Sequence, residues 1–80
     1  MKVTIDLSEL NPATRKDIAI QTTDKQLLLA LAKDEDSLVR LAVVSNSNVP
    51  KEVLSEHANE DEDSVVSWRA KHFLNLRTKQ

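Results

Sequence analysis

The chain contains no cysteine and no glycine, and each absence excludes a group of functions. Without cysteine there is no disulfide, no thiol nucleophile, no thiolate-bound iron–sulfur cluster and no cysteine-based zinc site. Phosphate-binding loops, dinucleotide fingerprints and nucleophile elbows all need glycine where the backbone turns sharply, so none can form here. Helix ends that would favour glycine are expected to use asparagine in the left-handed conformation, at Asn46, Asn48, Asn59 and Asn75.

Strong net charge, aromatic residues and long apolar runs are also scarce. The net charge of −2 is too small to indicate binding to nucleic acid or to a membrane surface. No run approaches the length of a membrane span, and the opening residues Met1 to Thr4 do not resemble a signal peptide. With 80 residues we expect one small, marginally stable domain, located in the cytoplasm, with no membrane contact.

A repeated tetrapeptide is the strongest positive signal. Asp-Glu-Asp-Ser occurs at Asp34 and again 27 residues later at Asp61, each time before an apolar pair and a helical pattern. A period of this length is typical of stacked short helices, which serve mainly as binding surfaces. The sequence therefore predicts an all-α repeat stack of about five helices.

The pattern of caps and apolar residues places these helices within a single domain. Residues 1–10 form an N-terminal arm, in which the alternation from Lys2 to Leu7 predicts a β-strand. Residues 11–63 hold the helical repeats. The first helix begins at Asn11-Pro12, a capping box at Thr23 opens the second, the third spans 37–45 and Pro50 starts the fourth. Residues 64–77 form a longer C-terminal capping helix.

Apolar spacing also predicts which side chains are buried. In the third helix Leu38, Leu41, Ala42 and Val44 are candidates for the core, whereas Arg15 in the first helix is expected to face water. In the last helix the inner face is expected to consist of Val66, Ala70, Phe73 and Leu74.

The segment 31–46 resembles the leucine-rich repeat variant, a HEAT-like helical repeat. The matching features are the acidic turn, Val39-Arg40, Asn46 and Pro50, and the resemblance extends over about residues 18–76. It implies a right-handed stack of short helices that holds another macromolecule, with Arg40 bonding the acidic turn of a neighbouring repeat. Some family members bind an iron–sulfur cluster through cysteines, which does not carry over to this chain.

The candidate contacts for a partner protein lie in the acidic turns and in the last helix. Trp68 lies off the expected inner face beside His72, and Arg69 adds a positive charge; an exposed tryptophan is a typical interface anchor. The acidic candidates are Asp34, Asp36, Asp61 and Asp63, whose simpler role is helix capping.

Catalytic, cofactor and metal sites are not expected. The acidic turns lack the glycine bend and distal glutamate of a calcium loop, and His57 and His72 have no evident third ligand. We therefore expect a non-enzymatic module that binds another protein as an adaptor, inhibitor or regulatory subunit, and it could also form a homo-oligomer. The alternative is a ribbon-helix-helix-like antitoxin or transcriptional regulator that dimerises through the N-terminal strand and contacts DNA through Lys2, Thr4 and Asp6.

Overall fold

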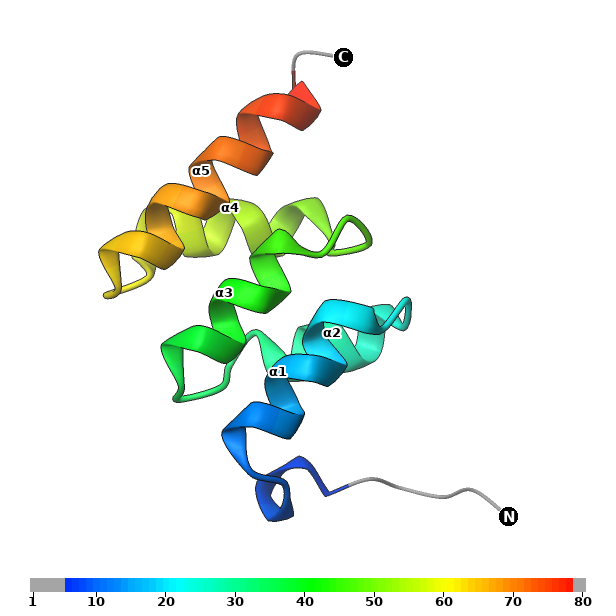
Figure 1. The fold of residues 1–80 in the computed structure, drawn as a ribbon. Helices are drawn as coiled ribbons and strands as arrows, with labels where there is room; N and C mark the ends of the chain where they lie inside the picture. The colour runs from blue at the N-terminus through cyan, green and yellow to red at the C-terminus, as the bar shows by residue number, and fades with distance from the viewer. Residues whose placement is uncertain (1–5, 79–80) are drawn as a thin grey trace.

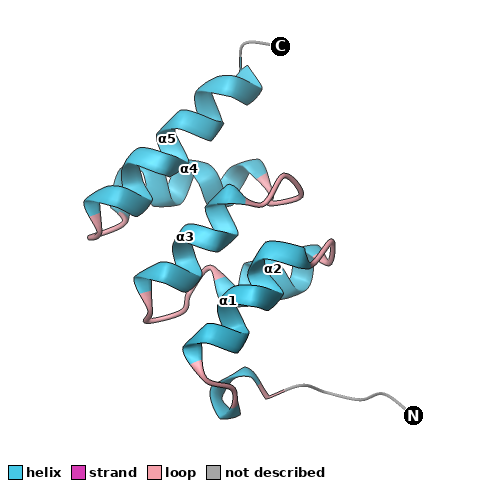
Figure 2. Ribbon diagram, viewed as in Figure 1, coloured by secondary structure: helices cyan, strands magenta, loops and turns pink. Residues whose placement is uncertain are grey.

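The computed structural model describes residues 6–78, and within this range the chain is helical and contains no β-strand (Figure 2). The all-α fold expected from the sequence is thereby confirmed. None of the described helices has the length and apolar content that a membrane crossing requires. A short 3₁₀ turn precedes five helices: η1 (Leu7–Glu9), α1 (Pro12–Gln21), α2 (Lys25–Leu31), α3 (Ser37–Ser45), α4 (Lys51–Glu60) and α5 (Ser64–Thr78).

The helices alternate in direction along the stack. Helices α1, α3 and α5 run the same way, one above the other, and α2 and α4 return between them (Figure 1). We call the first three the forward helices and the other two the return helices. Helix α3 packs against both α1 and α5, and α4 packs mainly against α5. Because the forward helices are parallel, their N-termini share one edge of the stack and their C-termini the other.

Each forward helix begins at a side chain that accepts a hydrogen bond from the free N–H groups of its first turn. Asn11 Oδ1 accepts from Thr14 N at 2.8 Å, and Asp36 Oδ1 accepts from Leu38 N at 2.8 Å. Asp63 Oδ1 accepts from Val65 N at 2.9 Å. These caps confirm the predicted starts. The cap of α2 is Asp24 rather than Thr23, because its carboxylate reaches two N–H groups of the first turn.

The expectation that asparagine would end helices in the left-handed conformation is wrong. No residue within 6–78 has a positive φ. Asn46 leaves α3 with φ −77° and ψ 127°, which is extended backbone. Helices α1 and α4 likewise end in extended backbone, at Thr22 and Asp61, and α2 ends at Ala32 in the right-handed helical region, so any residue can adopt these geometries. The absence of glycine therefore carries no conformational cost at these ends.

The core lies between the two sets of helices and is made mainly of valine, leucine and alanine. Leu38 was expected there but is 58% exposed. It stands two positions after the cap, about 100° and 140° around the axis of α3 from Val39 and Val43, which are fully buried. The largest fully buried side chains are Leu28, Leu31, Leu54, Val39, Val43, Val44, Val49 and Val66.

The strand predicted from Lys2 to Leu7 falls largely outside the described residues, which begin at Asp6. The part that is described has a different structure. Asp6 caps the 3₁₀ turn, and its carboxylate accepts from Ser8 N at 3.0 Å and from Ser8 Oγ at 2.5 Å. Leu7 therefore belongs to a helical turn, because this local hydrogen bonding competes with an extended conformation.

Candidate functional site

The forward helices are joined at their N-terminal edge by two ion pairs, which we call the arginine ladder. In the first, Arg15 Nε donates to Asp34 Oδ2 at 2.6 Å and Nη2 donates to Oδ1 at 3.3 Å. Arg15 Nη1 also donates to the carbonyl of Leu10. Arg15 was expected to face water, but its side chain is only 11% exposed. The reason is its position one turn into α1, beside the acidic turn of the next repeat.

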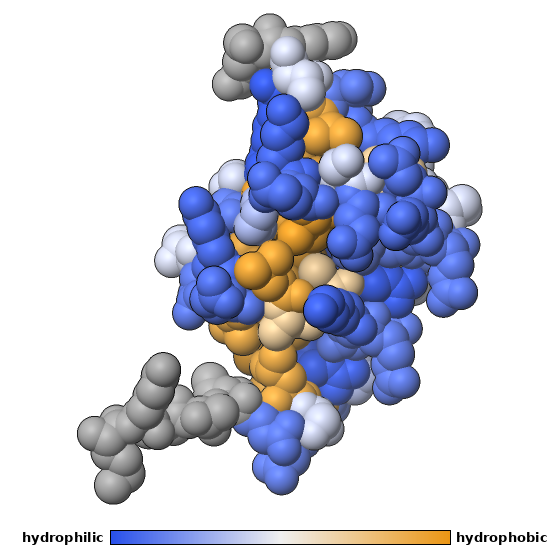
Figure 3. Space-filling model, turned by 180° about the vertical axis from the view of Figure 1, so that it is seen from behind, coloured by the Kyte–Doolittle hydropathy of each residue, from blue (hydrophilic) through white to orange (hydrophobic). Residues whose placement is uncertain are grey.

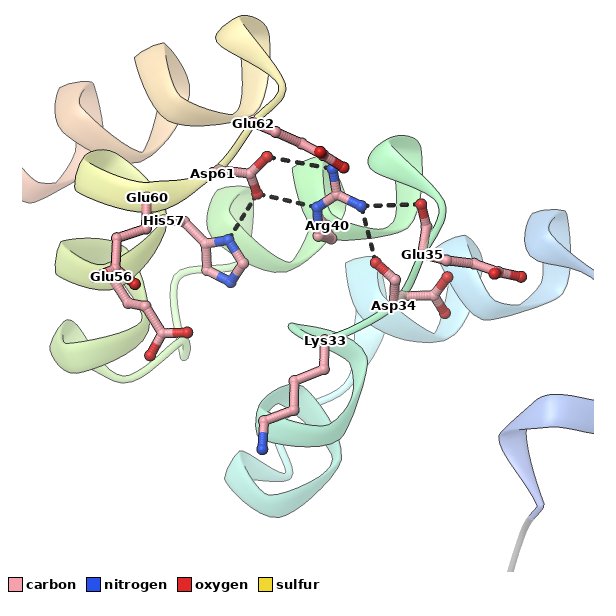
Figure 4. Close-up of a pocket in the computed structure, with 9 residues that line it drawn as sticks. All are labelled: Lys33, Asp34, Glu35, Arg40, Glu56, His57, Glu60, Asp61 and Glu62. Carbon is pink, nitrogen blue, oxygen red and sulfur yellow. Dashed lines mark hydrogen bonds and ion pairs between the residues drawn. The ribbon is translucent and has the colours of Figure 1, made fainter.

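The second pair repeats this geometry one unit further along. Arg40 Nε donates to Asp61 Oδ2 at 3.0 Å and Nη2 donates to Oδ1 at 3.2 Å. Arg40 Nη1 donates to the carbonyls of Asp34 and Glu35, so one guanidinium ties two acidic turns together (Figure 4). The resemblance to the HEAT-like repeats implied this role for Arg40, and the contact is confirmed.

The two aspartates of each acidic turn have different roles: the first binds an arginine and the second caps the following helix. Asp34 and Asp61 accept from the arginines, and each also accepts from the backbone N–H of Asp36 or Asp63 at 2.9 Å. Asp36 and Asp63 then cap the helices. Asp34 and Asp61 are 8% and 2% exposed at the side chain. We therefore give Asp34 and Asp61 an internal, structural role in place of the contact role expected from the sequence.

The ion pairs shift the ionisation of both aspartates. Burial acts to raise the pKa of Asp61, but hydrogen bonds from Arg40, the Asp63 N–H and His57 outweigh it, so the pKa lies below its ordinary value. The pKa of Asp34 is lowered in the same way, with Arg15 and the Asp36 N–H opposing burial. Both ladder carboxylates are thus held in the charged form.

The ladder stops at the third forward helix. Arg15 and Arg40 each stand four positions after the cap of their helix, and the same position in α5 is Ser67. Ser67 Oγ donates to the carbonyl of Ala58 at 2.9 Å, within the chain. Arg69, two positions later, lies elsewhere on the helix and approaches Ser45 Oγ at 3.4 Å. Helix α5 therefore has no group that continues the ladder.

The C-terminal edge has its own contacts between successive units. Asn46 Nδ2 donates to the carbonyls of Ala19 and Thr22, both at 2.8 Å. At the next level, Arg77 Nη1 and Nη2 donate to the carbonyls of Val49 and Ser47 at 2.5 and 3.0 Å. The end of α3 is thus bonded to the end of α1, and the end of α5 is bonded to the loop that follows α3.

An open acidic depression of about 440 Å³ lies beside the ladder. His57 Nδ1 contacts Asp61 Oδ2 at 2.7 Å, and Glu56 and Glu60 extend from α4 alongside it (Figure 4). Asp34 and Asp61 are neutralised by arginines, and Lys33 adds a positive charge to the lining. Within residues 6–78 no group of three or more histidine, aspartate and glutamate side chains has a geometry that could hold a metal ion.

The most exposed apolar side chains lie on the forward helices, on the side turned away from the core. Counted from the caps, these side chains fall within about 80° of one another around the helix axis, and most of the buried positions of the same helices lie on the other side. We call this surface the outward face. Its large residues are Ile20, Leu38, Val65, Trp68 and Leu76, which are 54%, 58%, 54%, 61% and 47% exposed.

Trp68 stands near the middle of the outward face on α5. Its ring stacks on His72 with centroids 5.5 Å apart and planes 7° from parallel. His72 in turn meets Phe73 edge-on at 5.4 Å. This stack holds the indole in one orientation while leaving most of it open to solvent. Val66 and Ala70 of the expected inner face are buried, with Phe73 and Leu74 partly buried.

Apolar surface is not confined to the outward face. Seen from behind, the molecule shows an apolar band that runs along the stack between hydrophilic side chains (Figure 3). The return helices nevertheless contribute just one large side chain that counts as exposed among the described residues, Leu29 at 39%. The outward face is therefore the surface with the most accessible large apolar groups.

Sequence reasoning placed Trp68, Arg69 and His72 together on α5, and it missed the neighbours that make them a surface. Leu38 was assigned to the core, and Val65 was left out of the expected inner face of the last helix. Aligning the three caps would have shown that both stand two positions after a cap, on the same side. The DNA-contact candidates Lys2 and Thr4 lie outside the described residues, and the Asp6 carboxylate is bonded to Ser8.

The chain was compared with protein-family models, with curated proteins and with solved structures, and none of them matches it.

Proposed function

We propose that this chain is a non-enzymatic helical-repeat module of the cytoplasm that binds another protein through its outward face, as an adaptor, inhibitor or regulatory subunit. The observation that carries the proposal is the exposure of Trp68, at 61%, among other large apolar side chains. Contiguous apolar surface on a small protein is costly in water unless a partner covers it. Tryptophan is also the residue most enriched among those that dominate binding energy.

The contacts that hold the stack together support the same proposal, because they do not involve the exposed apolar side chains of the outward face. The arginine ladder and the Asn46 and Arg77 contacts join the units at the two edges of the stack. Trp68 and Leu38 make no contribution to these contacts. The stack is therefore held together without its outward face, whose apolar side chains remain available to a protein.

An affinity capture from native lysate, run with and without nuclease, tests the proposal. The tagged wild-type chain is expected to recover a protein in both runs, and Trp68→Ala is expected to lose most of it. Lys51→Ala, an exposed change on α4, is the matched control and should capture as the wild type does. Recovery of nucleic acid that nuclease removes would instead support the DNA-binding alternative and contradict the proposal.

A further inference from the structure

We propose that the protein taken by the outward face is a second copy of this chain, paired face to face about a two-fold axis so that the forward helices of the two copies run antiparallel. The inference rests on the proposed function, since it names the occupant of the same surface. Most soluble oligomers are symmetric, and a two-fold interface requires a surface that is complementary to itself. Three features of the chain meet that requirement.

The first feature is the size of the stack. Residues 6–78 hold three forward and two return helices, whereas helical repeats generally need three units to bury a continuous core. Of the six large apolar side chains that are exposed in the described part of the chain, five lie on the outward face. Pairing two such faces would bury apolar surface that the short stack cannot bury by itself.

The second feature is that end-to-end stacking lacks the contacts that join units within the chain. Such stacking would bring α5 of one copy against α1 of the next. The ladder position of α5 is Ser67, so it offers no guanidinium to the acidic group at Glu9, which occupies the position equivalent to Asp34 and Asp61. Arg77 is already bonded to the carbonyls of Val49 and Ser47. Self-association through the ends is therefore disfavoured relative to the outward face.

The third feature is the distribution of charge along α5, at the outward face. Glu35 and Glu62 are exposed on the turns at the N-terminal edge, where they line the rim of the depression and extend away from α4 (Figure 4). Arg69 lies further along α5, seven residues after Glu62. A two-fold axis that lies in the plane of the face, at right angles to the forward helices and crossing α5 between Val65 and Trp68, brings Glu62 of each copy close to Arg69 of the other. The face is thus apolar and also complementary to itself in charge.

This geometry specifies the central contacts. Trp68 of each copy would pack on Val65 of the other, with Leu38 beside them, and Glu62 of each copy would approach Arg69 of the other. A buried tryptophan at the centre and charges at the rim correspond to the usual distribution of energy in an interface. Any other protein that binds the outward face would compete with the second copy.

Sedimentation equilibrium of the purified full chain, from low micromolar to millimolar concentration, tests the inference. The wild type is expected to dimerise, and Trp68→Ala and Leu38→Glu are each expected to weaken the dimer by more than about tenfold. Both side chains are mostly exposed, so circular dichroism should show an unchanged helical content. Leu29→Glu, on α2, is the matched control and should dimerise as the wild type does.

A charge exchange tests the antiparallel arrangement. Glu62→Lys and Arg69→Glu should each weaken self-association, because each places like charges together twice in the symmetric dimer. An equimolar mixture of the two variants should restore a dimer, since both contacts then join opposite charges. If the chains in the mixture associate as weakly as each variant does alone, the antiparallel pairing is overturned.

Two outcomes separate this inference from the proposed function. A monomeric wild type whose lysate capture still depends on Trp68 would overturn the second copy as occupant and leave the proposed function standing. A monomeric wild type whose capture is unaffected by Trp68→Ala would overturn both. A dimer that Leu29→Glu abolishes and Leu38→Glu preserves would also overturn the inference, because the pairing surface would then include α2.

Discussion

Arg40 and Asp61 form a bidentate ion pair that joins the second and third forward helices of the stack. The two side chains are 10% and 2% exposed. Arg40 also donates to the carbonyls of two residues in the acidic turn before its own helix. One guanidinium therefore connects two turns that lie far apart in the sequence.

We expect Arg40→Met to destabilise the fold by about 3 kcal/mol, because it leaves the buried Asp61 carboxylate without its main countercharge. Urea denaturation followed by circular dichroism measures this loss. Lys71→Met, an exposed change on α5, is the control, and we expect it to alter stability by no more than about 0.5 kcal/mol. Equal losses in the two variants would contradict the structural role of the ladder.

Lowering the pH should reduce the free energy of unfolding of the stack. The pKa values of Asp34 and Asp61 lie below their ordinary value of 3.8 in the folded chain, so near that pH the unfolded chain binds more protons. The stability from these pairs is present at neutral pH and is lost as the pH falls through about 4 toward the lowered pKa values.

Comparing variants at neutral and acidic pH measures this contribution. Asp61→Asn should be less stable than the wild type at pH 7 and should lose less further stability on acidification. Asp17→Asn, an exposed change on α1, should follow the wild-type pH dependence. If Asp61→Asn kept the full wild-type dependence, the lowered pKa of Asp61 could not be a source of stability.

A nearly isosteric substitution of Asn46 tests the contacts at the C-terminal edge. Asn46→Asp removes the two N–H donors to the carbonyls of Ala19 and Thr22 and places a negative charge beside them. We expect a loss of about 2 kcal/mol or more in urea denaturation. Asn59→Asp, exposed near the end of α4, should change stability far less. Similar effects for the two changes would argue against the contacts of Asn46.

Two leucines of α2 differ in burial, and comparing their substitutions tests the packing of the core. Leu31 is 1% exposed and Leu29 is 39% exposed. Leu31→Ala should cost about 2–5 kcal/mol through lost burial and the cavity it leaves, whereas Leu29→Ala should cost less than about 1 kcal/mol. Thermal unfolding of the two variants measures the difference, and a reversed order would contradict the placement of α2.

The sequence predicted helices best where caps and prolines mark them. The range 37–45 for α3 agrees with the structure because the acidic turn before it supplies both a cap and an interruption of the apolar pattern. Asn11-Pro12 likewise predicted the start of α1 correctly. These signals act over three or four residues, so they are readable without knowledge of the fold.

Contacts between units were harder to predict because they depend on how helices stack. Arg15 follows a polar pattern that is typical of a solvated residue, yet the acidic turn of the next unit covers it. Leu38 follows an apolar pattern, yet its position after the cap turns it outward. His57 is bonded to Asp61 at the end of its own helix, a contact that needs the ladder to be known first.

Acrylamide quenching of Trp68 fluorescence tests most directly the claim that bound protein covers the outward face. Trp68 is the one tryptophan of the chain, so its signal reports on this face alone. We predict strong quenching in dilute protein and weaker quenching as self-association or an added captured protein covers the indole. Quenching that is already weak in dilute protein, or that stays strong after protein has bound, would contradict the account.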